Sequence, residues 1–144
     1  MKSLSEIQAA SHAEKHLICP EFAARRDGTA LLLSSDESVS IMLCEEDHIR
    51  IQVIKAGLAL EQAYAEADKI DTILDGKLKY AFDERIGYLT QCPTNLGTAM
   101  RASVMLHLPA LTRCGQIARL AGTVSKLGLT IRGAYGAGSA STGD

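Results

Sequence analysis

Three short apolar runs lie within the first 54 residues of the chain. These runs cover residues 29–35, 38–44 and 48–54. In the third run Ile49, Ile51 and Val53 face one way and the residues between them face the other, which is the period of a half-buried strand. A Ser-Ser-Asp-Glu-Ser stretch between the first two runs is typical of a hairpin turn. The pattern predicts an antiparallel meander.

The apolar period then becomes that of a helix. Over residues 58–75 an apolar stripe recurs at helical spacing: Leu60, Ala63, Tyr64, Ala67, Ile70 and Leu74. Gly76 is predicted to end this helix, because glycine tolerates the left-handed conformation that commonly follows a helix. A second helix is predicted over residues 112–127, with Gly128 as its stop and this buried stripe: Ile117, Leu120, Ala121, Val124 and Leu127.

Further strands are predicted in the second half of the chain. Residues 77–91 indicate two strands around a turn near residues 85–87, and residues 101–108 alternate again until Pro109 ends the run. Residues 129–136 indicate a last strand. Residues 1–16 are predicted to form a polar, helical or frayed lead-in, and residues 136–144 a flexible tail. We expect an α+β fold, a mainly antiparallel sheet flanked by helices, in a single domain over residues 1–144.

Composition limits the class of partner and the compartment. A formal net charge of -2 gives no overall attraction to nucleic acid or to an anionic membrane, so we expect neither as a partner. No secretory signal and no apolar run of membrane-spanning length is visible, which favours a cytoplasmic location. The 4 cysteines are far apart and form no CxxC pair, which argues against a zinc knuckle or a redox dithiol.

Three of the predicted strands each carry one arginine opposite their apolar face. These are Arg50, Arg101 and Arg132. If the strands share a sheet, the guanidinium groups can converge on its polar face and bind phosphate through bidentate, permanently charged donors. Three unrelated, solvated arginines are the alternative that periodicity leaves open.

The acidic string Cys44–Arg50 (CEEDHIR) adds carboxylates to this face. In an extended strand Glu46, His48 and Arg50 point to one side, with Glu45 and Asp47 opposite. Glu46 and Arg50 would then lie roughly 13 Å apart, too far to pair, so that each could address a different part of one ligand. A carboxylate here could orient a cationic substrate and accept its proton. An edge-strand charge cluster that prevents aggregation is the alternative.

A thiol precedes a tight turn in residues 91–97 (QCPTNLG). Pro93 favours an extended conformation for Cys92, and the Thr94 hydroxyl is placed to donate to its sulfur. With the amides of the following turn, this favours the thiolate form of Cys92. The other three cysteines (Cys19, Cys44 and Cys114) are expected to be buried and inert.

These stretches, with LGLTIRGAYG near the C-terminus, resemble the ATP:guanido phosphotransferases. The Cys-Pro-Thr-Asn-Leu-Gly-Thr string matches that family's signature, and the Met-Leu-His-Leu-Pro-Ala-Leu run is most like its bacterial protein-arginine kinase branch. The resemblance covers the chain from about Glu14 onward and implies an antiparallel sheet flanked by helices.

The resemblance also implies roles for individual residues. Glu46 would hold and deprotonate the substrate guanidinium, and Cys92 would contact the same group as a thiolate. ATP with Mg²⁺ is the implied cofactor, and no metal ligand from the chain itself is assigned. The implied cofactor-binding residues are Arg50, Arg101 and Arg132, with His48 beside them.

The chain departs from the family pattern in two respects. The bacterial branch carries two acids in a loop after the last strand, and this chain has Ala137 and Ala140 there. The family's upstream Ser-x-Arg-x-Arg motif and the rest of its catalytic domain lie outside the sequence, so we expect the front part of a catalytic domain.

Two functions follow from these observations. The first is ATP-dependent phosphoryl transfer to a guanidinium group, on protein arginine side chains or on a small guanidino compound. The alternative is a catalytically impaired module that binds nucleotide or phosphoarginine and assembles with an activator or a completing subunit. An uncovered sheet edge and apolar patch would favour a homo-oligomer.

Overall fold

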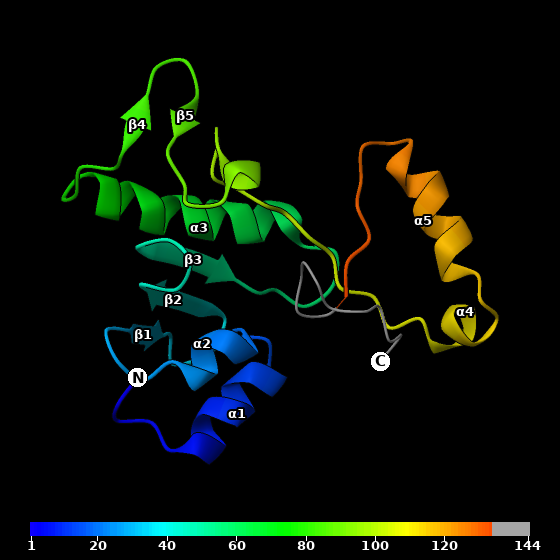
Figure 1. The fold of residues 1–144 in the computed structure, drawn as a ribbon, viewed down its shortest axis with the longest axis horizontal. Helices are drawn as coiled ribbons and strands as arrows, with labels where there is room; N and C mark the ends of the chain where they lie inside the picture. The colour runs from blue at the N-terminus through cyan, green and yellow to red at the C-terminus, as the bar shows by residue number, and fades with distance from the viewer. Residues whose placement is uncertain (134–144) are drawn as a thin grey trace. The chain divides into compact units, whose positions relative to one another are not determined.

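In a computed structural model that describes residues 1–133, the three apolar runs pair as an antiparallel sheet (Figure 1). The strands are β1 (Ala30–Leu33), β2 (Val39–Leu43) and β3 (Ile49–Val53), in the order β1-β2-β3. Met42 on the central strand pairs with Leu31 on one side and with Arg50 on the other. The predicted meander is confirmed.

The best-packed core lies where two N-terminal helices cover one face of this sheet. Helix α1 (Glu6–Glu14) begins at a capping box in which Ser5 and Gln8 exchange hydrogen bonds, and α2 (Pro20–Ala24) begins with proline at its first turn. Met42 is fully buried in this core. Its buried neighbours are Met1, Ala13, Ile18 and Phe22. The expected lead-in is therefore helical, and its inner side belongs to the core.

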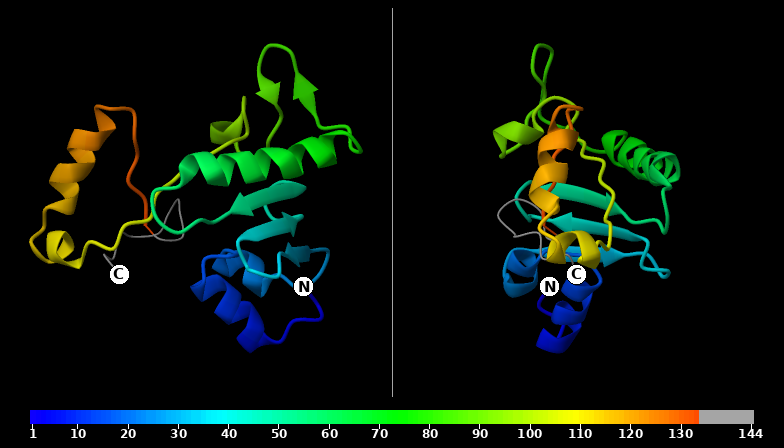
Figure 2. Two further views of the ribbon diagram at one scale, coloured as in Figure 1. Left: turned by 180° about the vertical axis from the view of Figure 1, so that it is seen from behind. Right: turned by 90° about the vertical axis from the view of Figure 1, so that its right-hand side faces the viewer.

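Helix α3 (Leu60–Asp75) contacts β3 and confirms the helix predicted over residues 58–75. Figure 2 shows the helix beside this strand from two further directions. Gly76 follows the helix with φ of −64°, so it continues the right-handed conformation, and the left-handed geometry expected there is wrong. The stripe is only half covered, since Tyr64 remains 55% exposed.

A short hairpin follows α3. Its strands β4 (Phe82–Asp83) and β5 (Gly87–Tyr88) confirm the two strands predicted around residues 85–87. The hairpin also bonds to the later turn, because the Tyr88 N–H donates to the Gly97 carbonyl at 2.9 Å.

The chain divides into two compact units, Met1–Ser103 and Val104–Asp144. In the described part of the second unit, α4 (Pro109–Arg113) and α5 (Ile117–Ser125) replace the single helix predicted over residues 112–127. The break falls at Gly115, whose φ of 66° lies in the left-handed region and interrupts the helical hydrogen bonds. Gly128, with φ of 77°, does end α5 as predicted.

Two predicted strands do not form in the described residues. Residues 101–108 and 129–132 contain no strand. An alternating segment becomes a strand only where a neighbouring strand accepts its backbone hydrogen bonds. Arg101 and Arg132 therefore do not share a sheet with Arg50, and the predicted common sheet face is wrong. The tail at residues 136–144, with Ala137 and Ala140, lies outside the described residues.

The fold class itself agrees with expectation, because helices accompany antiparallel sheets. Within residues 1–133, no helix is both long and apolar enough to cross a bilayer.

Candidate active site

The acidic string forms a loop rather than the start of a strand. Residues Cys44–His48 bend between β2 and β3, and the Cys44 N–H donates to the His48 carbonyl at 2.9 Å to close the loop. Cys44 has φ of 58°, in the left-handed region that non-glycine residues seldom adopt. The extended arrangement expected for Glu46, His48 and Arg50 is therefore wrong, although the Glu46 and His48 side chains are both exposed.

Arg25 connects this loop to α2. Its Nη1 donates to the carbonyl oxygens of Cys44 at 2.9 Å and Glu45 at 2.7 Å. Arg25 is the C-cap residue that directly follows α2. The two carbonyls directly before Glu46 are thus fixed by a side chain from outside the hairpin.

Glu45 is the inward-facing acid of the loop, with a side chain only 15% exposed. Its carboxylate pairs with Arg50 at 3.3 Å and accepts a hydrogen bond from the Cys19 thiol at 3.3 Å. Arg50 also lies 3.5 Å from the Gln52 side-chain oxygen. Sequence reasoning assigned Arg50 to nucleotide phosphates and missed its pairing with Glu45, because the alternation placed the two residues on opposite faces.

This pairing changes two acid–base equilibria. Burial raises the pKa of the Cys19 thiol to about 11, and the nearby Glu45 carboxylate adds to the effect. Burial also acts to raise the pKa of Glu45. The backbone N–H of Glu46, the Cys19 thiol and Arg50 outweigh that burial and hold the Glu45 pKa below its ordinary value.

The signature segment has the local geometry that its sequence predicts. Cys92 is extended, with φ of −86° and ψ of 118°, and residues Pro93–Asn95 form a single turn of 3-10 helix. The Cys92 sulfur lies 3.0 Å from the Thr94 hydroxyl oxygen. A second hydroxyl, that of Thr90, donates to the Cys92 carbonyl at 2.8 Å. The predicted sulfur–hydroxyl contact is confirmed.

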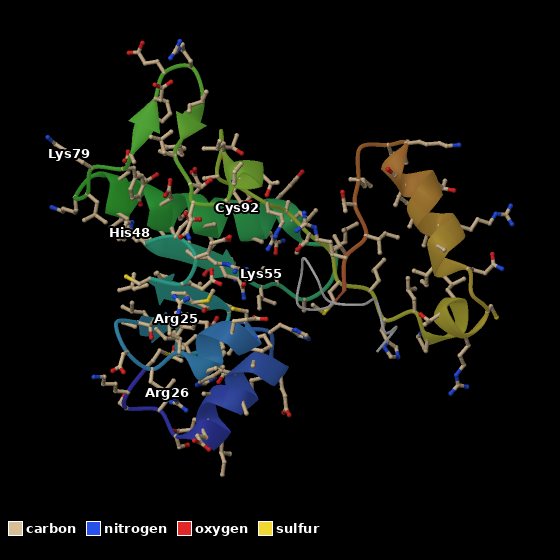
Figure 3. The ribbon with its side chains drawn as sticks, in the orientation of Figure 1. Arg25, Arg26, His48, Lys55, Lys79 and Cys92 are labelled. Atoms are coloured by element: carbon tan, nitrogen blue, oxygen red, sulfur yellow. The ribbon has the colours of Figure 1, made fainter. Side chains whose placement is uncertain are left out.

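The loop and the signature segment are joined directly. The Gln91 N–H donates to the Asp47 carboxylate at 2.7 Å. Cys92, which is labelled in Figure 3, is the next residue. An open pocket of about 440 Å³ lies at this junction, lined by the whole loop Cys44–His48 with Arg25, Ala81, Leu89 and Gln91. Three carboxyl-bearing residues, Glu45, Asp47 and the exposed Glu46, make the pocket suited to a cationic group.

The two remaining arginines of the predicted phosphate site lie elsewhere in the chain. Arg101 is exposed in an irregular segment of the first unit, and Arg132 is exposed in the second unit. Their roles stay predictions from the family resemblance.

The expected burial of the other cysteines is wrong for two of them. Cys44 and Cys114 are exposed, and Cys19 is partly buried. Cys44 lies in the acidic loop and Cys114 directly follows α4, positions where the backbone turns at the surface.

Residues 1–133 contain no group of three or more His, Cys, Asp or Glu side chains arranged to hold a metal ion. Mg²⁺ commonly binds through substrate phosphates with only one or two carboxylates from the protein.

The sequence matches the ATP:guanido phosphotransferase C-terminal catalytic domain over residues 1–144. It is 49% identical over 144 residues to the protein-arginine kinase of Caldanaerobacter subterraneus subsp. tengcongensis and 51% identical over 144 residues to that of Brevibacillus brevis. All of this chain matches in both cases, but it spans only 43% and 40% of those relatives.

Solved structures share the fold. The duplicated taurocyamine kinase of Schistosoma mansoni, solved with bound transition state analog components, has a TM-score of 0.84 at 25% identity, over 99% of this chain and 21% of that one. A lombricine kinase has a TM-score of 0.72 at 22% identity, over 100% of this chain and 43% of that one, which supports the fold alone. The chain belongs to the ATP:guanido phosphotransferase family, within its C-terminal catalytic domain.

Proposed function

We propose that this chain carries part of the active site of an ATP-dependent kinase that phosphorylates a guanidinium group, with protein arginine side chains as the acceptor. The supporting observation is the bond between Asp47 and Gln91, which brings the loop of Glu46 to the segment of Cys92 beside an acid-lined pocket. The names of the curated relatives favour protein arginine over a small guanidino compound.

In this proposal Glu46 orients the guanidinium and acts as its base. The carboxylate accepts a proton from the attacking nitrogen while that nitrogen forms a bond to the γ-phosphorus of ATP. The bond between that phosphorus and the bridging oxygen breaks, and its electron pair leaves with ADP. The Cys92 thiolate contacts the same guanidinium and helps to align it for in-line transfer.

Arginine side chains neutralise the phosphates. Arg50, Arg101 and Arg132, with His48, are proposed to bind the nucleotide, and Mg²⁺ is proposed to bind through its phosphate oxygens. Because Arg50 already pairs with Glu45, a phosphate must either share the guanidinium through its remaining donors or displace the carboxylate.

Partners remain proposals as well. An activator or completing subunit and a homo-oligomer are consistent with apolar side chains that stay exposed in the described residues, such as Leu106 at 63% and Leu127 at 74%. A cytoplasmic location, and the absence of nucleic-acid and membrane partners, stay predictions from composition.

The decisive experiment incubates the full chain with ATP, Mg²⁺ and an arginine-rich protein and measures acid-labile phosphate on the acceptor. We expect transfer by the natural chain and none by Glu46→Gln, which keeps the size of the side chain but removes the base. Glu84→Gln is the matched control, because Glu84 is an exposed acid in the β4–β5 turn. Nucleotide binding without any transfer by the natural chain would contradict the proposal and favour a binding module.

A further inference from the structure

The acidic loop is held on both sides of Glu46 by groups from other segments. Before Glu46, the carbonyls of Cys44 and Glu45 accept hydrogen bonds from Arg25. After Glu46, the carboxylate of Asp47 accepts one from the Gln91 N–H. The Glu46 carboxylate itself has no hydrogen bond or ion pair within residues 1–133. The loop backbone therefore sets the position from which the exposed Glu46 side chain extends, and no partner within the described residues selects its rotamer.

That backbone conformation needs external support. Cys44 is held at φ of 58°, and a left-handed conformation costs a non-glycine residue roughly 1–2 kcal/mol. Such a conformation persists only where surrounding contacts determine it. The contact that reaches the Cys44 and Glu45 carbonyls is the Arg25 guanidinium, a planar donor group that never loses its charge.

We propose that Arg25 is a positioning residue, which holds loop Cys44–His48 in the conformation that presents Glu46 to the substrate guanidinium. This inference rests on the proposed function for its catalytic meaning. It concerns the loop backbone, to which Arg25 donates its two hydrogen bonds. A displacement of the base by about 1 Å can cost on the order of 10²-fold in rate.

The chain offers a matched control in the next residue. Arg26 also donates from Nη1 to two backbone carbonyls, those of Met1 at 3.4 Å and Leu4 at 2.7 Å. Its bonds hold the N-terminal segment and do not reach the loop. Figure 3 labels both arginines. Arg25→Ala and Arg26→Ala therefore remove the same kind of interaction from two different places.

Two backbone amides report the loop without any need for activity. The Cys44 N–H is bonded to the His48 carbonyl, and the Gln91 N–H is bonded to Asp47. In Arg25→Ala we expect both amides to exchange with solvent roughly tenfold faster, since opening the loop breaks both hydrogen bonds. In Arg26→Ala we expect the Leu4 N–H, bonded to Met1, to exchange faster while the two loop amides keep their natural rates.

The kinetic arm separates positioning from binding. For Arg25→Ala we expect kcat to fall by about 10- to 100-fold, with the Kd of ATP unchanged within about twofold. Arg25→Lys should recover part of kcat, because an ammonium can still donate to the two carbonyls but lacks the planar fork. Arg26→Ala should keep the kcat of the folded fraction.

Two results would overturn the proposal. One is equal exchange of the Cys44 and Gln91 amides in Arg25→Ala and Arg26→Ala, which would make Arg25 a general stabilising residue. The other is a rise in the Kd of ATP that matches the fall in kcat, which would make Arg25 a phosphate ligand. If the natural chain transfers no phosphate, the proposed function fails, and the exchange comparison alone still decides whether Arg25 holds the loop.

Discussion

The carboxylate of Asp47 accepts a hydrogen bond of 2.7 Å from the backbone N–H of Gln91, 44 positions further along the chain. This bond joins the acidic loop to the signature segment. Each segment carries one of the two residues proposed to contact the acceptor, Glu46 and Cys92. The distance between those two residues therefore depends on a contact that neither of them makes.

Removal of the Asp47 carboxylate should separate the two segments. For Asp47→Ala we expect faster exchange of the Gln91 amide and a fall in kcat of up to about 10²-fold, with a loss of stability of only about 1 kcal/mol. Asp47→Asn retains an acceptor oxygen, so its kcat and its Gln91 amide exchange rate should lie between those of Asp47→Ala and those of the natural chain. Asp83→Ala is the control, because Asp83 accepts backbone N–H bonds from Arg85 and Ile86 within the β4–β5 turn. Equal kcat in Asp47→Ala and Asp83→Ala would contradict this prediction.

The four thiols should differ in reactivity, and Cys19 should be the slowest. Its pKa of about 11 stands against an ordinary value of 9.0, so at neutral pH its thiolate fraction is roughly 100-fold lower than that of an unperturbed thiol. Labelling with a thiol reagent, followed by peptide mapping, measures each rate. Glu45→Gln should speed Cys19 only in part, because burial is the larger cause of its raised pKa. Faster labelling of Cys19 than of the other three thiols in the folded protein would show that the Cys19 thiol is not buried beside Glu45.

Of the four thiols, Cys92 is expected to react fastest, because its sulfur lies 3.0 Å from the Thr94 hydroxyl oxygen. Cys44 and Cys114 are more exposed than Cys92, so access alone would favour them. Thr94→Val tests the cause, since it removes the hydroxyl and keeps the branched shape. An unchanged Cys92 rate in that variant would mean that the hydroxyl contributes nothing to its reactivity.

Stability at acidic pH should depend on Glu45 and Asp36. The Ser34 hydroxyl and the Ser38 N–H lower the pKa of Asp36 to about 2, and the pKa of Glu45 is also lowered. A carboxyl whose folded pKa is lowered stabilises the fold above its unfolded pKa, and this contribution is lost as the pH falls through the folded pKa. The ordinary values are 3.8 for Asp and 4.5 for Glu, so stability should decline as the pH drops below about 4.5.

Urea unfolding between pH 7 and pH 2 measures this loss. Glu45→Gln and Asp36→Asn should each give a shallower decline, and the two effects should add, because no contact within residues 1–133 links the two residues. A decline as steep in both variants as in the natural chain would assign the acid sensitivity to other carboxyls.

The sequence predicted the elements whose formation depends on local pattern. Strands β1 to β3 each coincide with a short apolar run, and helix α3 follows an apolar stripe at helical spacing, so local pattern identified them. Residues 101–108 have an equally regular alternation and form no strand, because a strand also needs a neighbour to accept its hydrogen bonds. Gly115 divides α4 from α5 inside the helix predicted over residues 112–127, just before the first residue of its apolar stripe, Ile117.

The site was predictable to a similar extent. Glu46 and Cys92 were assigned from their motifs and their roles remain proposals, whereas the pairing of Glu45 with Arg50 was not predicted. The prediction that alternate side chains face opposite sides holds only in a continuous strand. Residues 44–48, which carry the acids, form a bend, so the prediction does not apply to them. Arg25 lies in a polar Arg-Arg-Asp-Gly turn, and no sequence signal distinguishes it from Arg26, although the two side chains hold different segments.

Ala137 occupies a position where the bacterial branch of the family carries a loop acid, and it lies outside the described residues. Without that acid the guanidinium would be held from one side, so turnover should fall below the about 1–100 s⁻¹ typical of kinases. Ala137→Glu should therefore raise kcat with little change in ATP affinity. Assays of phosphoryl transfer and of nucleotide binding on the same variant give both values. An ordinary kinase rate for the unmodified chain would show that the loop acid is dispensable.

The close approach of Gly87 and Gly97 holds the signature segment against the β4–β5 hairpin. A Cβ added at Gly87 would lie 2.5 Å from the Gly97 carbonyl oxygen, and Gly87 also has φ of 82°. Gly87→Ala therefore combines left-handed strain, which costs about 1–2 kcal/mol, with a backbone clash. Gly57→Ala separates these causes, because Gly57 has φ of 74° and no atom within 4 Å of the added Cβ.

Both alanine variants should lower the free energy of unfolding through strain. Only Gly87→Ala should also displace the turn after Cys92, because the clash pushes Gly97 away and breaks its 2.9 Å bond from the Tyr88 N–H. Exchange of the Tyr88 amide and the labelling rate of Cys92 measure that displacement. Gly87→Ala could instead lose no more stability than Gly57→Ala and leave the Tyr88 exchange rate and the Cys92 labelling rate unchanged. That result would show that the hairpin moves to relieve the clash and does not fix the position of the signature segment.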